Sequence, residues 1–186
     1  MTDAISDAGV DVRAVVTAFA QYGFRKTSME DIARAANLSR QSIYKKFGSK
    51  EACYDWALRG YMTGLYKEVF AQLSRKTDTP LDTLRAAVDT MVGEGVEFSQ
   101  IAHGSEMLDA AMKAVEAAPG DLRAEYTEHM AQFLLRYDLA ANLKQGRDLA
   151  HVVITASRGA LLNAVTRQAF SDDMERVLHT LFPDAR

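Results

Sequence analysis

The fold of this chain is decided by residues 27–47, which read TSMEDIARAANLSRQSIYKKF. Thr27 and Glu30 have the spacing of a capping box, which predicts that a helix begins here. Asn37 tolerates the left-handed conformation that ends a helix, and Ser39 is suited to cap the next one. The segment therefore predicts two short helices joined by a tight turn, the arrangement called a helix-turn-helix.

The second helix of this pair is expected to be the one that contacts DNA. Ile43 is expected to face inward, while a helix-turn-helix places the N-terminal residues of its second helix at the base edges of the major groove. Arg40 can bind the O6/N7 edge of guanine, and Gln41 can bind the N6/N7 edge of adenine. The remaining candidate DNA-binding residues, several of them suited to phosphates, are Thr27 (through its backbone N–H), Ser28, Ser42, Tyr44, Lys45, Lys46 and Lys50.

The charge distribution agrees with this prediction although the chain as a whole is acidic. Residues 25–50 contain seven basic and two acidic side chains, a net charge of +5. Because the whole chain has a net charge of −3, the remainder carries −8. A basic segment on an acidic body favours binding to a polyanion at one end of the molecule.

The rest of the chain has the apolar spacing of helices. Residues 12–20 predict a helix that ends at Gly23, and residues 50–74 predict a long helix capped by Ser49. The later expected helices begin at Pro80, span about 100–117, begin at Asp121, and cover 146–170 and 172–182. The chain is therefore predicted to be all-α, with about nine helices.

Several classes of protein are not indicated by the sequence. Cys53 is the single cysteine, which excludes an intrachain disulfide or a cysteine-rich zinc site and favours a small buried side chain. The sequence has neither a signal peptide nor a run of about 18 apolar residues, so a cytoplasmic protein that does not enter a membrane is expected. The four histidines are widely spaced, and no glycine-rich phosphate loop or metal motif occurs. We therefore expect no enzyme activity, metal or cofactor.

A known family shares an ungapped pattern of about thirty residues with this chain. The pattern is Phe19-Ala20-x-Tyr22-Gly23-Phe24-x-x-Thr27-Ser28-Met29-x-x-Ile32-Ala33-x-x-Ala36-x-Leu38-Ser39-x-x-Ser42-Ile43-Tyr44-x-x-Phe47-x-x-Lys50-Glu51. It resembles the N-terminal signature of tetracycline-repressor (TetR) family regulators. The chain departs from that signature at Asn37 and Gln41, where glycine is usual, and at Lys46, where an aromatic residue or histidine is common.

The resemblance implies a three-helix helix-turn-helix DNA-binding domain in residues 1–48 and a helical ligand-binding and dimerisation domain in residues 49–186. It implies double-stranded DNA with a palindromic operator as partner, a homodimer, and release from DNA by a small hydrophobic or amphipathic effector. The residues suggested to line an effector pocket are Met62, Leu65, Met91, Phe98, His103, Met107, Tyr126, Met130 and Phe133. The residues suggested for the dimer interface are Val152, Val153, Ala156, Gly159, Ala160, Val165, Met174, Val177, Leu178 and Leu181.

Each of these interpretations has a plainer alternative. The methionines and aromatic residues of the C-terminal part can equally form an ordinary core, and the last two apolar stripes can pack within one chain. A helical protein-interaction module that no longer binds DNA is the main alternative function. Such a module predicts acidic or apolar residues at the base-contacting positions, whereas this chain has Arg40, Gln41, Ser42 and Lys45.

Overall fold

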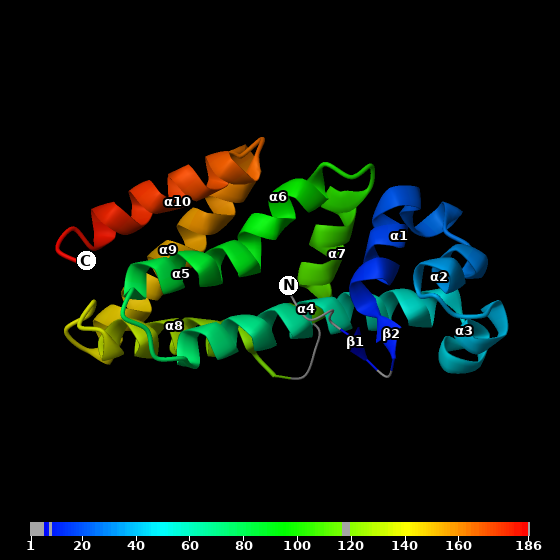
Figure 1. Ribbon diagram of the computed structural model, residues 1–186, viewed down its shortest axis with the longest axis horizontal. Coiled ribbons are helices and arrows are strands. Elements are labelled where there is room, and N and C mark those ends of the chain that lie inside the picture. Colours follow the sequence, from blue (N-terminus) through cyan, green and yellow to red (C-terminus); the bar gives the residue numbers. More distant parts are fainter. Residues whose placement is uncertain (1–5, 8, 117–119, 186) are drawn as a thin grey trace. The chain divides into compact units, whose positions relative to one another are not determined.

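The computed structural model describes residues 6–7, 9–116 and 120–185, and in this part of the chain the fold is almost entirely helical (Figure 1). Strands β1 (Ser6–Asp7) and β2 (Val10–Asp11) form a short antiparallel ribbon, with Ser6 opposite Asp11. The helices are α1 (Val12–Lys26), α2 (Met29–Ala35), α3 (Arg40–Phe47), α4 (Lys50–Ser74), α5 (Pro80–Val88), the π-helix η1 (Asp89–Gly93), α6 (Glu94–Ser99), α7 (Gly104–Glu116), α8 (Leu122–Arg136), α9 (Leu143–Asn163) and α10 (Arg167–Leu181). The prediction of an all-α fold is confirmed. Counting the uninterrupted run α5–η1–α6 as one helix leaves nine among the described residues.

The chain packs as two units, and α4 belongs to both. The first unit contains residues 1–64 and 98–119, and the second contains residues 65–97 and 120–186. The first unit thus includes α7 and residues 50–64 of α4 in addition to the segment before residue 49. The domain boundary at residue 48 stays a prediction. None of the described helices is long and apolar enough to cross a membrane.

The first unit is built around the apolar side of α1. Val12, Val15 and Phe19 are fully buried there, as the spacing predicts, and Ile32 of α2 and Ile43 of α3 are fully buried too. Cys53 is also fully buried, which confirms its expected place in the core, and burial raises the pKa of its thiol to about 12. The helix-turn-helix therefore rests on a continuous apolar core.

A break in α1 at Gly23 sets where the next helix begins. Gly23 has φ 75° and ψ 154°, so α1 does not stop there but bends and continues to Lys26. The Gly23 carbonyl accepts both the backbone N–H of Thr27 (3.1 Å) and its hydroxyl (2.7 Å). Thr27 is buried, and Ser28, not Thr27, caps α2.

The capping box of α2 is therefore one residue later than predicted. The Ser28 hydroxyl accepts the backbone N–H of Asp31, and the Asp31 carboxylate accepts the backbone N–H and hydroxyl of Ser28. These bonds, and more weakly Arg34, hold the pKa of Asp31 below its ordinary value. Thr27 and Ser28 both fit the sequence rule for a cap, and only the bend at Gly23 decides between them.

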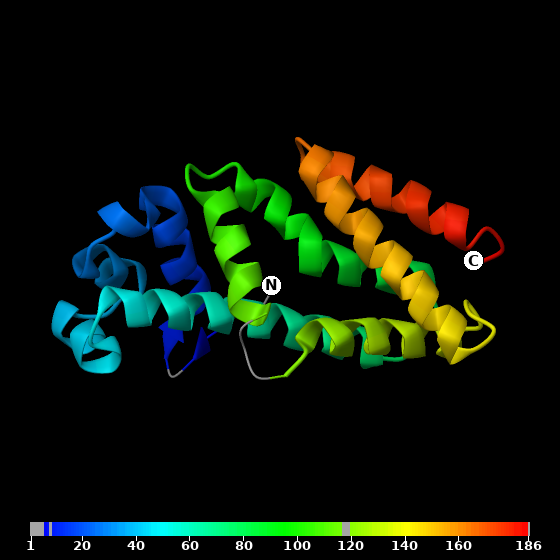
Figure 2. The same ribbon diagram turned by 180° about the vertical axis from the view of Figure 1, so that it is seen from behind.

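In the second unit, α9 packs against both α8 and α10 (Figure 2). The helix ends of the two units agree only in part with the predictions. Ser49 caps α4 as expected, and Asp121, where a helix was predicted to begin, is the residue that caps α8. The predicted helix 146–170 was wrong at both ends, since α9 begins at Leu143 and ends at Asn163, and Thr166 caps α10 by accepting the N–H of Ala169 (3.1 Å). Likewise α7 begins at Gly104, not near residue 100, and the predicted end at residues 117–119 lies outside the described residues.

Position 23 favours glycine for two reasons: its φ is positive, and the ring of His103 lies where a side chain would be. An added Cβ at Gly23 would lie 3.0 Å from the ring of His103, whereas one at Gly48, with almost the same φ of 74°, would meet nothing within 4 Å. We expect Gly48→Ala to lower the free energy of unfolding by about 1 kcal/mol through backbone strain alone. Gly23→Ala should cost more, about 2–3 kcal/mol, because the His103 ring must also move.

Urea unfolding followed by circular dichroism and by the fluorescence of Trp56, the single tryptophan, measures both changes. Equal losses for the two variants would contradict the prediction that the ring of His103 leaves no room for a side chain at residue 23.

Candidate DNA-binding surface

The turn between α2 and α3 holds the two helices at a fixed angle. Asn37 has φ 52°, which confirms the left-handed conformation expected there. The next residue, Leu38, donates its backbone N–H to the carbonyl of Ala33 (2.9 Å). Ser39 then caps α3 by accepting the N–H of Ser42 (3.0 Å). The predicted turn and cap are confirmed.

One side of α3 is open to solvent and polar. Ile43 is fully buried, as predicted, and fixes which side faces out. The exposed side chains of this helix are Arg40, Gln41, Ser42, Tyr44, Lys45 and Lys46. The Ser42 hydroxyl also lies 2.8 Å from that of Ser39, so it belongs to the cap as well as to this surface. We call these six residues the α3 face.

Arg40 is held by two neighbours. Its guanidinium lies over the ring of Tyr44, 5.5 Å from the ring centroid. Its Nη1 also lies 4.0 Å from Oε2 of Glu30, an acidic side chain in the first turn of α2. Interaction with Tyr44, and more weakly with Glu30, raises the pKa of Arg40, so this side chain is permanently charged.

Two lysines expected to bind phosphates have structural contacts as well. The Lys50 ammonium donates to the carbonyl of Arg25 (3.2 Å) and lies 4.7 Å from the ring centroid of Phe24, so it ties the start of α4 to the end of α1. The Lys46 ammonium lies 5.6 Å from the ring centroid of Phe47 and 5.8 Å from that of Trp56. Because an ammonium has three donors, the hydrogen bond of Lys50 to Arg25 does not prevent Lys50 from also binding a phosphate.

Thr27 and Ser28 do not offer the groups that the sequence suggested. The backbone N–H of Thr27, proposed as a phosphate ligand, donates to Gly23 inside the domain, and the side chain is buried. Ser28 is exposed, but its hydroxyl and N–H form the capping box with Asp31. Among the predicted DNA-binding residues, those of the α3 face and Lys50 are therefore better placed than Thr27 and Ser28 to contact DNA.

The residues suggested for an effector pocket are divided between the two packing units. His103 has contacts of its own in the first unit: its backbone N–H donates to the carbonyl of Ala20 (2.8 Å), its ring lies against Gly23, and its Nδ1 lies 3.2 Å from Oε2 of Glu106. The other eight are wholly or partly buried, which both a core and a pocket require. They are Met62, Phe98 and Met107 in the first unit and Leu65, Met91, Tyr126, Met130 and Phe133 in the second.

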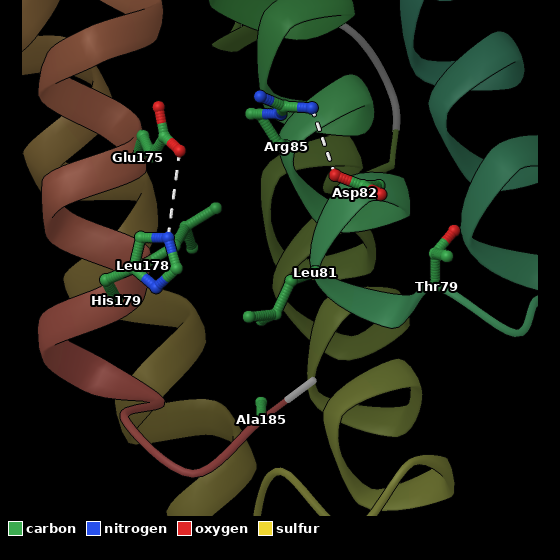
Figure 3. Close-up of a pocket in the computed structure, with 8 residues that line it drawn as sticks. All are labelled: Thr79, Leu81, Asp82, Arg85, Glu175, Leu178, His179 and Ala185. Carbon is green, nitrogen blue, oxygen red and sulfur yellow. Dashed lines mark hydrogen bonds and ion pairs between the residues drawn. The ribbon is translucent and has the colours of Figure 1, made fainter.

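A pocket of about 250 Å³ in the second unit lies elsewhere, between α5 and α10 (Figure 3). Its polar side chains lie beside one another along their own helices: Asp82 is 3.0 Å from Arg85, and Glu175 is 3.7 Å from His179. None of the nine residues suggested for an effector pocket lines it. Among the described residues, no group of three or more His, Cys, Asp and Glu side chains is placed to hold a metal ion.

The residues suggested for a dimer interface fall into two sets. Val153, Ala160, Met174 and Leu178 are buried within the second unit, where α9 packs on α10. Those that face outward or lie at the edge are Val152, Ala156, Gly159, Val165, Val177 and Leu181. The sequence did not single out Leu162, which is 85% exposed, although its spacing of three residues from Gly159 was a usable signal.

Comparison with known proteins places this architecture in a family. Residues 12–55 match the model of "Bacterial regulatory proteins, tetR family". The chain is 35% identical over 92 residues to the HTH-type transcriptional repressor KstR2 of Rhodococcus jostii, covering 48% of this chain and 41% of that protein. It is 24% identical over 129 residues to the uncharacterized HTH-type transcriptional regulator YezE of Bacillus subtilis, covering 69% of this chain and 64% of that protein. The chain therefore spans less than two thirds of the length of these relatives.

Solved structures share the fold over most of the chain. A TetR-family transcriptional regulator from Pectobacterium atrosepticum has a TM-score of 0.59 at 18% identity, covering 94% of this chain and 93% of that one. A putative TetR-family regulator from Mesorhizobium loti has a TM-score of 0.58 at 15% identity, covering 91% and 93%. Residues 12–55, which contain α1 to α3, thus match the tetR family of bacterial regulatory proteins, and the chain as a whole shares the fold of TetR-family structures.

Proposed function

We propose that this protein is a sequence-specific DNA-binding transcriptional regulator that acts in the cytoplasm. The observation that carries the proposal is the α3 face, a solvent-exposed set of polar and basic side chains on the second helix of a well-capped helix-turn-helix. The seven basic residues of segment 25–50 are exposed or partly exposed, so the positive charge of that segment is available to a duplex.

The α3 face divides into base-contacting and phosphate-contacting residues. Arg40 and Gln41 lie in the first turn of α3, the part of such a helix that contacts base edges, and a good bidentate contact contributes about 1–3 kcal/mol of discrimination. Lys45 and Lys46 lie in its last turn, where phosphates are the expected partners. Phosphate contacts set the position of the helix without specifying a sequence.

A homodimer is the second part of the proposal. One such helix makes too few contacts for tight and specific binding, so two copies on a palindromic operator are expected. The outer side of α9 has exposed apolar or small residues at Val152, Gly159 and Leu162, and Val165 follows at 78% exposure. An added Cβ at Gly159 would meet nothing within 4 Å, so another helix can approach closely there. We propose that this side of α9 packs against a second copy.

Repression and release by an effector complete the proposal. KstR2 of two organisms is named a repressor, which favours promoter occlusion as the mode of action. Helix α4 runs without interruption from the DNA-binding domain into the second unit, which makes it the natural link between them. A small hydrophobic or amphipathic effector would shift the binding equilibrium only by its difference in affinity for the DNA-bound and free forms.

Selection from a random-sequence DNA library at near-physiological salt tests the proposed function. We expect a short palindrome to be enriched, because two identical helices contact two half-sites related by symmetry. Salt-sensitive retention of all sequences alike would instead favour the helical interaction module, whose basic surface has no sequence preference.

Substitutions on the α3 face should distinguish residues that contact bases from residues that contact phosphates. We expect Arg40→Ala and Gln41→Ala to relax the preference at particular base pairs, each by about 1–3 kcal/mol. Lys45→Ala should weaken all sequences alike and reduce the slope of log affinity against log salt by about one. Fluorescence anisotropy with operators altered one base pair at a time measures both effects. Equal losses on every sequence for all three variants would contradict the assigned roles.

A charge on the outer side of α9 should disrupt the proposed dimer. We expect Leu162→Glu to shift the protein from dimer to monomer in sedimentation, because the carboxylate would be buried without a partner. Met112→Glu in α7 is the matched control, since Met112 is a large apolar side chain that is 41% exposed in the other unit. If both variants remained dimers of wild-type stability, the dimer would use another surface.

A further inference from the structure

The contact between Arg40 and Glu30 has a consequence for specificity. Glu30 is 58% exposed and Arg40 is 62% exposed, so neither side chain is needed to fill the core. They come from different helices, and their side chains meet at 4.0 Å across the helix-turn-helix. An acidic side chain beside a DNA-binding surface opposes binding to phosphates, so a role in simple affinity does not account for Glu30.

The geometry restricts Arg40 on two sides. The guanidinium lies over the ring of Tyr44, 5.5 Å from the ring centroid, and Oε2 of Glu30 lies 4.0 Å from Nη1. A guanidinium has five N–H donors in a rigid plane, so a contact at Nη1 leaves the remaining donors for a second partner. Two adjacent N–H donors in that plane are what the O6 and N7 atoms of guanine accept.

The carboxylate of Glu30 also partly neutralises the charge of Arg40. When its charge is partly neutralised, an arginine binds a phosphate less tightly, because that interaction depends mainly on charge. It keeps its directional contact with guanine, which depends on the planar fork. Glu30 therefore penalises contacts with any DNA more than the contact with the correct base.

We propose that Glu30 is a specificity-determining residue, which orients Arg40 for guanine and keeps it from binding phosphates indiscriminately. Glu30 is a positioning residue in this role, since it acts through Arg40 and touches no base. The inference rests on the proposed function, because it concerns the α3 face as a DNA-binding surface. Its partner is one guanine in each half-site of the operator.

The test compares Glu30→Gln with Glu51→Gln, which makes the same change of charge at an exposed acidic residue in the first turn of α4. Affinities are measured for the selected palindrome, for that palindrome with each base pair altered, and for unrelated DNA. We expect Glu30→Gln to raise the affinity for unrelated DNA by about two- to five-fold, the effect of one exposed charge pair. Affinity for the palindrome should not rise, so discrimination should fall by at least the same factor.

Two further readouts identify the mechanism. The base pair at which Glu30→Gln relaxes preference should be the one relaxed by Arg40→Ala, and in an Arg40→Ala background Glu30→Gln should have a smaller effect than in wild type. Glu51→Gln should leave discrimination unchanged. Circular dichroism of each variant confirms that the helices are intact.

The outcomes separate the inference from the function on which it rests. If wild-type protein discriminates but Glu30→Gln and Glu51→Gln change affinity alike on all DNA, the charge acts only in general and the inference is overturned. If wild-type protein binds every sequence alike, the proposed function fails. The inference then fails with it, because there is no specificity for Glu30 to determine.

Discussion

The helix-turn-helix depends on the last turns of α1, where one left-handed glycine organises several contacts. The bend at Gly23 directs its carbonyl to both the N–H and the hydroxyl of Thr27, which places Ser28 at the start of α2. The same bend leaves room for the ring of His103 against the Gly23 backbone. Two residues later, the carbonyl of Arg25 accepts the ammonium of Lys50. The positions of α2, α4 and the start of α7 are thus tied to a single turn of backbone.

The α3 face combines a rigid support with solvent-exposed side chains. Three features fix the orientation of α3 relative to α2. They are the left-handed conformation of Asn37, the cap formed by Ser39 and the burial of Ile43. Within this frame Arg40 is restrained by a ring and a carboxylate, and Lys46 by two aromatic rings. Restrained side chains lose less conformational entropy on binding, so the restraint favours recognition without adding contacts.

The second unit presents a different kind of surface. Exposed apolar residues such as Leu162 and Val165 are unfavourable in water unless they are covered by another molecule, and they lie next to the break between α9 and α10. Arg167, in the first turn of α10, binds the carboxylate of Asp89 in the π-helix η1 through two hydrogen bonds. This ion pair fixes the start of α10 against η1. The position of α10 beside the exposed apolar residues therefore depends on an ion pair as well as on apolar packing.

The sequence by itself determined that the chain is helical, the core side of α1, the turn at Asn37, the cap at Ser39 and the inward position of Ile43, because each depends on neighbours within a few residues. It also identified the residues that form the α3 face. Only the tertiary structure decided that Ser28 rather than Thr27 caps α2, that His103 packs against Gly23, and that Glu30 lies beside Arg40. Each of these features depends on the bend at Gly23 or on how separate parts of the chain pack together, which local spacing does not specify.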